Sequence, residues 1–174
     1  YIYKGDLRDE DILDKIFVYF NKKNIPIEAV IHLAGLKDIS DSFRSPNKYW
    51  DVNVKGSIKL FKIMEKYGCK NMVFSSSATV YDKSFLGLMN EESPLKPSNP
   101  YGETKLEVER VLKENFKKRK NNWNIIVLRY FNPIASHFSG LIGEDPKYKA
   151  TNLFPLLIDV ASSSDKILKI YGND

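Results

Sequence analysis

The chain has 174 residues, a formal net charge of +5 and 43% hydrophobic residues, which is enough to bury a core and is typical of a soluble globular protein. The single cysteine excludes an internal disulfide and a cysteine-rich zinc site, and the two histidines lack metal-ligand spacing, so we expect no metal. No apolar run approaches the roughly 18 residues of a transmembrane helix, and the one basic cluster, at 117–120, is typical of a solvated helix end, so we expect neither membrane nor nucleic-acid binding.

Apolar periodicity predicts alternating strands and helices along the first half of the chain. Residues 1–3 predict the end of a strand, and apolar residues at helical spacing between positions 13 and 20 predict a helix. Residues 28–34 are almost continuously apolar, which favours a strand buried on both faces. Positions 50–64 predict a helix of about five turns, with Gly68 as its C-cap.

The second half continues this alternation: a strand at 71–75, a helix from 101 to about 118, a strand at 125–128, a short helix at 153–161 and a last strand at 167–171. The pattern predicts an α/β fold, in which right-handed crossovers connect a parallel sheet that helices cover on both faces. In such sheets a ligand binds beyond the carboxyl ends of the strands. We expect the polar or glycine-containing strand ends to form one crevice: 5–7, 34–37, 75–77 and 130–132.

The stretch from Ser75 to Lys105 carries the strongest chemical signal. Three serines at 75–77 leave an apolar strand, and Pro100 precedes Tyr101 at a predicted helix start. Tyr101 and Lys105 share one helix face, with Cβ atoms roughly 5–6 Å apart. An ammonium lowers the pKa of a neighbouring phenol from its usual value of about 10. Tyr101 is therefore a candidate general base, although an exposed pair at a helix start has the same spacing.

Ser-Ser-Ser-Ala-Thr-Val-Tyr at 75–81, followed by Pro-Tyr-Gly-x-x-Lys at 100–105, resembles the extended short-chain dehydrogenase/reductase superfamily and, within it, the UDP-glucose (UDP-galactose) 4-epimerases. Further matches lie at 143–146, 152–155 and 171–174. The resemblance implies a partial Rossmann-like, doubly wound parallel sheet that lacks the N-terminal dinucleotide-binding βαβ unit. Residues 1–174 would form a single partial NAD-binding domain, with the start of a sugar-nucleotide-binding region at about 134–174.

The resemblance also implies which residues act. The catalytic residues would be Ser77, Tyr101 and Lys105. The residues that would contact NAD lie at strand ends and on the helices that follow: Asp6, Leu7, Leu33, Ala34, Gly35, Lys37, Asn53, Ser75, Tyr101, Lys105 and Tyr130. The residues that would contact the UDP-sugar substrate lie partly in the same loops and partly beyond the last predicted crevice strand: Lys37, Ser77, Ala78, Thr79, Tyr101, Phe131, Asn132, Asn152 and Leu153.

The reaction implied by the resemblance is NAD-dependent inversion at carbon 4 of a UDP-hexose, through a transient 4-keto sugar, in galactose metabolism. Tyr101 would take the proton of the 4-hydroxyl, Ser77 would hydrogen-bond the 4-oxygen, and Lys105 would stabilise the phenolate. NAD is regenerated in each cycle, so it acts as a bound cofactor. The resemblance further implies a cytoplasmic homodimer, formed through the helices that contain Trp50 and Tyr101.

The sequence departs from this pattern in several places. Asp82 stands where a glycine usually follows the tyrosine, which we expect to alter the loop bearing Ser77, and residues 37–42 and 134–138 also differ from the commoner residues. No Gly-x-x-Gly-x-x-Gly phosphate loop occurs, and the acidic residue that would hold the adenosine ribose is missing with it. We therefore expect the chain to be an internal piece of a longer protein, inactive and a poor binder of NAD by itself.

Two other functions remain open from the sequence. A sugar-nucleotide dehydratase or decarboxylase is the nearest enzymatic alternative, but those enzymes place acidic residues after the serine, where this chain has Ala78 and Thr79. A non-catalytic relative that binds a partner through its sheet is an alternative of another class. The intact set of Ser77, Tyr101 and Lys105 argues against it, because a binding role does not require a proton-transfer geometry.

Overall fold

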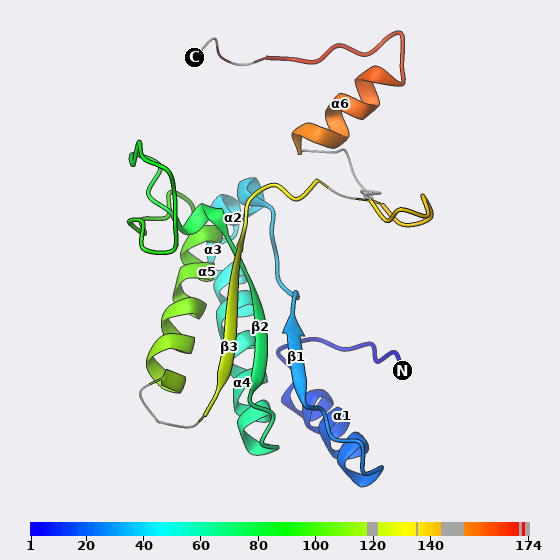
Figure 1. The fold of residues 1–174 in the computed structure, drawn as a ribbon, viewed down its shortest axis with the longest axis vertical. Helices are drawn as coiled ribbons and strands as arrows, with labels where there is room; N and C mark the ends of the chain where they lie inside the picture. The colour runs from blue at the N-terminus through cyan, green and yellow to red at the C-terminus, as the bar shows by residue number, and fades with distance from the viewer. Residues whose placement is uncertain (118–121, 135, 144–151, 171, 173–174) are drawn as a thin grey trace. The chain divides into compact units, whose positions relative to one another are not determined.

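The computed structural model describes residues 1–117, 122–134, 136–143, 152–170 and 172 (Figure 1). The chain divides into two compact units, Tyr1–Phe131 and Asn132–Asp174. The elements are, in order, α1 Glu10–Lys22, β1 Ala29–His32, α2 Ile39–Arg44, α3 Pro46–Tyr49, a π-helical segment Trp50–Lys55, α4 Gly56–Lys66, β2 Asn71–Ser77, a 3₁₀ turn Ala78–Val80, α5 Pro100–Val111, a second π-helical segment Leu112–Lys117, β3 Asn124–Tyr130 and α6 Leu153–Ala161. Among the helices described, none combines the length and apolar character needed to cross a membrane.

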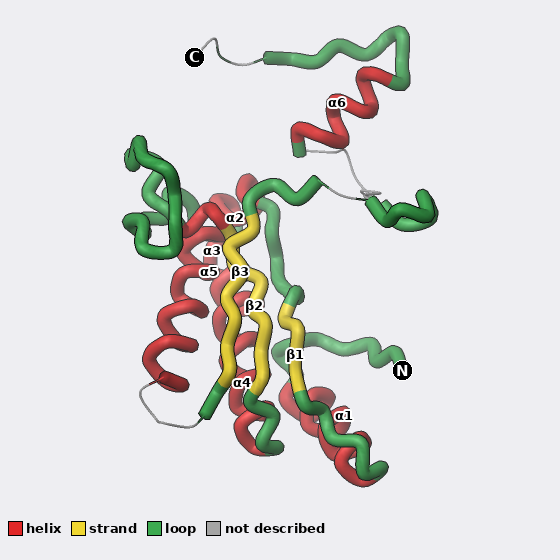
Figure 2. The backbone as a smooth tube through the Cα atoms, viewed as in Figure 1, coloured by secondary structure: helices red, strands yellow, loops and turns green. Residues whose placement is uncertain are grey.

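The first unit contains a parallel sheet with the strand order β1-β2-β3 (Figure 2). The register places Ala29 beside Asn71 and Ser77 beside Tyr130, so the serine strand β2 is central. The predicted strands at 71–75 and 125–128 are confirmed, each a few residues longer, and α1 and α6 lie where helices are predicted. The helix predicted over 50–64 also forms, within a continuous helical run from α3 through α4. Gly68 follows it with φ +70°, as expected of a C-capping glycine.

The hydrophobic core lies between one face of the sheet and the helices α1, α4 and α5. Phe74 of β2 packs there with Phe61 and Met64 of α4 and Val108 of α5, and each of these side chains is at most 1% exposed. Phe17 of α1 joins the same cluster. Burial of this apolar surface is what holds the three helices on the sheet.

The opposite face of the sheet remains open within the first unit. Ile31 of β1 is 69% exposed and Ile126 of β3 is 57% exposed, so the predicted burial of the 28–34 strand on both faces is wrong for the described residues. The physical reason is the strand order. Right-handed crossovers that advance in one direction place their helices on the same face, and the order β1-β2-β3 never reverses.

Two predicted strands do not form. Residues 1–3 pair with no strand; the rings of Tyr1 and Tyr3 instead lie edge-on against Tyr19 and Phe20 of α1. The last predicted strand is described only over 167–170, where the backbone is irregular and Ile167 is 86% exposed. Strand pairing requires a neighbouring backbone with free donors and acceptors, and neither segment meets one among the described residues.

Candidate active site

The start of α5 places Tyr101 and Lys105 on one helix face. Asn99 caps this helix, because its side-chain oxygen accepts a hydrogen bond from the backbone N–H of Gly102 at 2.8 Å. Pro100 occupies the first helical position, where its missing N–H costs nothing. The Lys105 Nζ then lies 5.9 Å from the centre of the Tyr101 ring. The predicted helix start and the predicted proximity of these two side chains are confirmed.

Gly102 brings the helix start against the turn that follows the serine strand. A Cβ atom at this position would lie 2.7 Å from the backbone oxygen of Thr79 and 3.1 Å from the Thr79 hydroxyl. Any larger residue would push α5 away from this turn. The glycine next to Tyr101 thus sets the distance between the helix and the end of β2.

Ser77 is the residue through which this turn meets the helix. Its Oγ accepts hydrogen bonds from the Thr79 backbone N–H at 3.2 Å and from the Thr79 hydroxyl at 3.0 Å. The Ser77 hydroxyl also lies close enough to the Tyr101 side chain to lower the pKa of that phenol by hydrogen bonding. Because its oxygen already accepts two hydrogen bonds, its proton is available for donation. Ser77 can therefore donate a hydrogen bond to an oxygen atom that lies beside the Tyr101 hydroxyl.

Lys105 is a buried ammonium beside the end of β2. Its Nζ donates to the backbone oxygen of Ser75 at 2.8 Å and lies 5.1 Å from the centre of the Phe74 ring. The residue is 5% exposed, and burial lowers its pKa to about 8. Lys105 therefore keeps its positive charge at neutral pH and is held at the strand end by Ser75.

The expected lowering of the Tyr101 pKa by Lys105 is not found. Burial raises the pKa of Tyr101 above its usual value, and the hydrogen bond from Ser77 only partly opposes this effect. The ammonium lies over the ring and is bonded to Ser75. Spacing along the helix predicted the proximity correctly, but the pKa depends on desolvation, which the spacing does not report.

Asn53 connects the loop after β1 to helix α5 by hydrogen bonds. It lies in the π-helical segment, a conformation frequent at functional sites. Its side chain accepts from the Leu36 N–H at 2.8 Å and donates to the Leu36 oxygen and the Thr104 hydroxyl, each at 3.0 Å. Gly35, at φ +157°, passes so close that a Cβ would lie 3.0 Å from Asn53 and 3.8 Å from the Lys105 Nζ.

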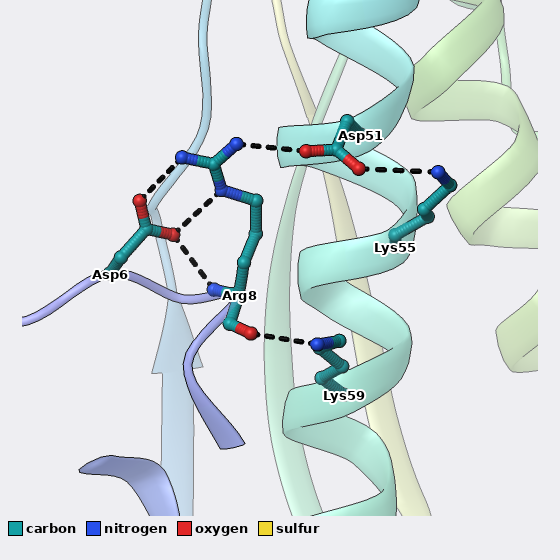
Figure 3. A network of polar contacts seen from close by, with 5 residues as sticks. All are labelled: Asp6, Arg8, Asp51, Lys55 and Lys59. Carbon is teal, nitrogen blue, oxygen red and sulfur yellow. Dashed lines mark hydrogen bonds and ion pairs between the residues drawn. The ribbon is translucent and has the colours of Figure 1, made fainter. Parts of the chain in front are cut away.

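A second polar cluster surrounds Asp6, where the chain leaves toward α1 (Figure 3). Its carboxylate accepts from the Arg8 backbone N–H at 2.8 Å, from Nε at 2.9 Å and from a terminal guanidinium nitrogen at 2.7 Å. The other terminal nitrogen of Arg8 reaches Asp51 at 2.8 Å, and Lys59 donates to the Arg8 backbone oxygen at 2.8 Å. Arg8 holds the pKa of Asp6 well below its usual range. The cluster lines an open depression of about 840 Å³ that also includes Lys55.

The remaining predicted contact residues have different surroundings. Leu7 packs against Gly56 of α4, while Leu33, Ala34 and Lys37 are exposed in the segment after β1. The side chains of Tyr130 and Phe131 are also largely exposed, at 43% and 63%.

The remaining residues predicted to contact the substrate lie in the turn after Ser77 or in the second unit. Ala78 lies in the 3₁₀ turn after Ser77. Asn132, Asn152 and Leu153 belong to the second unit, so their contacts with a substrate stay predictions. The sequence matches at 144–146, 171 and 173–174 lie outside the described residues.

Sequence reasoning missed several polar residues that support the site. These are Arg8, Ser76, Thr104, Glu109 and Arg129. Two of them left a signal in the sequence. Glu109 lies one helical turn after Lys105, and Arg129 is a charged residue that directly follows the apolar run at 125–128.

Curated proteins similar to this chain are UDP-glucose 4-epimerases. The enzyme GEPI48 of Cyamopsis tetragonoloba is 45% identical over 172 residues, which is 99% of this chain and 47% of that protein. The enzyme of Bacillus subtilis is 44% identical over 172 residues, with 99% and 49% covered. The chain spans about half the length of the curated relatives it matches.

Solved structures lead to the same group. UDP-glucose 4-epimerase from Bifidobacterium longum in complex with NAD+ and UDP has a TM-score of 0.78 and 42% identity over 88% of this chain and 44% of that one. The enzyme of Stenotrophomonas maltophila, with bound NAD and formylated UDP-arabinopyranose, has a TM-score of 0.77 and 36% identity over 88% and 44%. These similarities confirm the predicted partial Rossmann-like fold. The family described as the NAD dependent epimerase/dehydratase family matches residues 1–173, and the chain belongs to that family.

Proposed function

We propose that the full-length protein interconverts UDP-galactose and UDP-glucose by inversion at carbon 4, with NAD as a bound cofactor, in galactose metabolism. The observation that carries this proposal is the meeting of Ser77, Tyr101 and Lys105 at the end of β2. The Ser77 hydroxyl lies close enough to lower the Tyr101 pKa, and the buried Lys105 ammonium lies beside the ring. This arrangement suits proton removal from a secondary alcohol, because a phenol and a hydrogen-bond donor converge on one oxygen position.

The residues around this set fit a dinucleotide cofactor. Gly35 leaves room that a side chain would fill, directly beside Asn53 and Lys105. The Lys105 ammonium suits a ribose hydroxyl, and the exposed Asp6 carboxylate suits an amino group such as that of adenine. Bound NAD would accept a hydride from carbon 4 of the sugar and later return it.

Side chains of this protein would transfer the proton and orient the substrate. Tyr101, as phenolate, takes the proton of the 4-hydroxyl while the hydrogen on carbon 4 leaves as hydride. Ser77 donates a hydrogen bond to the same 4-oxygen and keeps it in place. When hydride returns to the opposite face of the ketone, Tyr101 returns the proton. In between, we propose that the Lys105 ammonium attracts the phenolate, an effect that the desolvation of Tyr101 outweighs in this structure.

The dehydratase alternative is disfavoured by the turn that follows Ser77. Removal of water needs an additional acid and base near the sugar, and related dehydratases place two carboxylates there. Ala78 has no titratable group, and the Thr79 hydroxyl already donates to Ser77 at 3.0 Å. The relatives named above, which are UDP-glucose 4-epimerases, support the same choice.

The proposal includes an assembly and a location. We propose a cytoplasmic homodimer that forms through the helices containing Trp50 and Tyr101. Trp50 is 40% exposed, although tryptophan is usually well buried, and such side chains are enriched at protein interfaces.

The direct test is to incubate the full-length protein with UDP-galactose and to look for UDP-glucose without added NAD. Conversion toward an equilibrium mixture is expected, because the cofactor is regenerated in every cycle. A product that has lost water would support a dehydratase. Accumulation of NADH in proportion to product would support a dehydrogenase, and absence of any reaction would contradict the proposal.

A further inference from the structure

A buried ion pair lies behind the catalytic residues. Glu109 is on α5, one turn beyond Lys105, and Arg129 is near the end of β3. The Arg129 Nε contacts one carboxylate oxygen at 3.1 Å, and a terminal guanidinium nitrogen contacts the other at 2.8 Å. Only 9% of the Glu109 side chain and 16% of the Arg129 side chain are exposed. A bidentate pair of this kind fixes orientation as well as distance.

Ser76 connects this pair to the catalytic strand. Its hydroxyl donates to the Glu109 carboxylate at 2.5 Å, and the residue is 2% exposed. Its two neighbours both contact the catalytic helix. The carbonyl of Ser75 holds Lys105, and the Ser77 hydroxyl lies close enough to Tyr101 to lower its pKa. The position of Ser76 therefore determines both contacts between the strand and the helix.

Arg129 also connects the strand to the long loop at 82–99. A terminal nitrogen donates to the backbone oxygen of Glu91 at 3.2 Å, and the guanidinium carbon lies 4.9 Å from the centre of the Tyr81 ring. Tyr81 follows the 3₁₀ turn that begins after Ser77 and pairs with Leu95 of the loop. One guanidinium thus contacts α5, the serine turn and the loop.

We propose that Glu109 and Arg129 are positioning residues that hold the end of β2 and the loop at 82–99 in register with the catalytic face of α5. This inference rests on the proposed function for its kinetic readout. Among the described residues, neither Glu109 nor Arg129 is hydrogen-bonded to Ser77, Tyr101 or Lys105; they act through Ser76 and Tyr81. Small displacements of a catalytic group can cost on the order of 10²-fold in rate.

A positioning role has a signature that a purely structural role lacks. Ser77 and Lys105 both lie beside Tyr101, and both depend on the strand end that Ser76 holds. If the strand end shifts, the hydrogen bond from Ser77 to Tyr101 weakens, and the pKa of Tyr101 rises further. The acid limb of the rate profile then moves to higher pH. Loss of folding stability alone would leave the kcat and the pH profile of the folded enzyme unchanged.

The experiment compares Glu109→Gln with Glu107→Gln in the full-length protein. Glu107 lies on the same helix, but its ion pair with Arg110, at 3.5 Å, is exposed, with the Arg110 side chain 62% accessible. We expect Glu109→Gln to lower kcat about 10- to 100-fold with KM changed less than about threefold, and to shift the acid limb upward. Glu107→Gln should match the wild-type enzyme. Equal kinetics in the two variants would overturn the inference.

Two further variants keep the test decisive if Glu109→Gln fails to fold. Ser76→Ala removes only the link to the strand and leaves Glu109 paired with Arg129. It should lower kcat and shift the acid limb in the same direction. Arg129→Lys keeps the charge but loses the bidentate geometry, so it should recover only part of the rate that Arg129→Met loses. A wild-type pH profile in Ser76→Ala, or full recovery in Arg129→Lys, would contradict the proposed role.

Amide hydrogen exchange separates this inference from the proposed function. Exchange across 82–99 should be faster in Glu109→Gln than in Glu107→Gln, because Glu109 holds the guanidinium that contacts Glu91 and Tyr81. This readout does not depend on any reaction. A wild-type protein that leaves UDP-galactose unchanged would reject the proposed function, while unchanged exchange in Glu109→Gln would reject the positioning role.

Discussion

Two polar clusters of the first unit differ in how water reaches them. The Tyr101 cluster, formed by Ser77, Tyr101 and Lys105, is mostly buried, with Lys105 5% and Ser77 8% exposed. The Asp6 cluster is formed by Asp6, Arg8, Asp51, Lys55 and Lys59 (Figure 3). It is open to solvent, since the side chains of Asp6 and Arg8 are 50% and 43% exposed. Shifted pKa values occur in both clusters, but they arise from different causes.

In the Tyr101 cluster, burial away from water is the main cause of the shifted pKa values. Desolvation lowers the pKa of Lys105 to about 8, and burial also raises that of Tyr101. In the Asp6 cluster the shift comes first from the hydrogen bonds of Arg8 to Asp6, and solvent screens such pairs. Substitutions in the buried cluster should therefore alter the chemistry. Substitutions in the open cluster should alter only the orientation of a bound ligand.

The largest effect is expected from Tyr101→Phe, which removes only the hydroxyl. Turnover of the full-length enzyme should fall by at least the ~10²–10⁴-fold typical of a general acid–base group. Circular dichroism and the thermal midpoint should stay near wild type. Tyr67→Phe is the matched control, because its hydroxyl binds Asp14 at 2.8 Å and lies in neither cluster. Retention of more than a tenth of wild-type turnover in Tyr101→Phe would contradict the assigned role.

Lys105→Met should come next in size and should change the pH profile. Desolvation outweighs the ammonium in setting the pKa of Tyr101, but loss of that positive charge should raise this pKa further, so the acid limb of kcat should move to higher pH. The wild-type enzyme should also lose activity as pH rises through about 8, because Lys105 gives up its proton there.

The matched variant is Lys105→Arg, which keeps its charge at alkaline pH. Above pH 8, Lys105→Arg should keep a larger fraction of its own maximal activity than the wild-type enzyme keeps of its maximum. Measuring kcat from pH 5 to pH 10 in all three proteins provides the comparison. Lys105→Met could instead lower kcat at every pH and leave both limbs of the pH profile in place. Lys105 would then act only by its position, and its charge would have no part in the chemistry of the buried cluster.

Gly102→Ala tests how closely the buried cluster is packed. The new Cβ would lie 2.7 Å from the Thr79 backbone oxygen, so α5 must move away from the turn bearing Ser77. We expect a loss of about 1–3 kcal/mol in the free energy of unfolding, as for other overpacked sites, together with lower kcat.

Gly5→Ala is the matched change beside the Asp6 cluster. The three atoms nearest to its Cβ would all belong to the Ile12 side chain, the closest at 2.7 Å, and a side chain can move more easily than backbone. It should be tolerated better in denaturant titrations and in turnover. Equal losses in the two variants would show that packing is equally tight in both clusters.

Features fixed by neighbours in sequence were predictable here, and features fixed across the fold were not. The spacing of Tyr101 and Lys105, the start of α5 at Pro100 and the alternation of strands and helices from β1 to β3 follow from local pattern, and these predictions are confirmed. The sheet face that the described residues of the first unit leave uncovered depends on strand order, which no local pattern contains. The contact of Glu109 with Arg129 joins a helix to a strand 20 positions away. The pKa of Tyr101 depends on burial, which only the packed structure defines.

Arg8→Met should have the smallest effect and tests the open cluster most directly. Without the guanidinium, the pKa of Asp6 rises toward its ordinary value of about 3.9, so the carboxylate stays ionised at neutral pH and only its orientation is lost. Affinity of the full-length protein for NAD should fall about two- to fivefold, as expected of exposed ion pairs. High salt should shrink the difference from wild type, and kcat at saturating sugar should not change.

Arg110→Met is the matched control for Arg8→Met, since it removes an exposed arginine of α5 that contacts Glu107 at 3.5 Å. It should leave NAD affinity, measured by calorimetric titration, at the wild-type value. A drop in kcat in Arg8→Met would mean that the Asp6 cluster communicates with the chemistry. The route available is short, because Asp51, which binds Arg8, and Asn53, which holds Leu36 and Thr104, lie in the same π-helical segment. Solvent exposure would then no longer separate the roles of the two clusters.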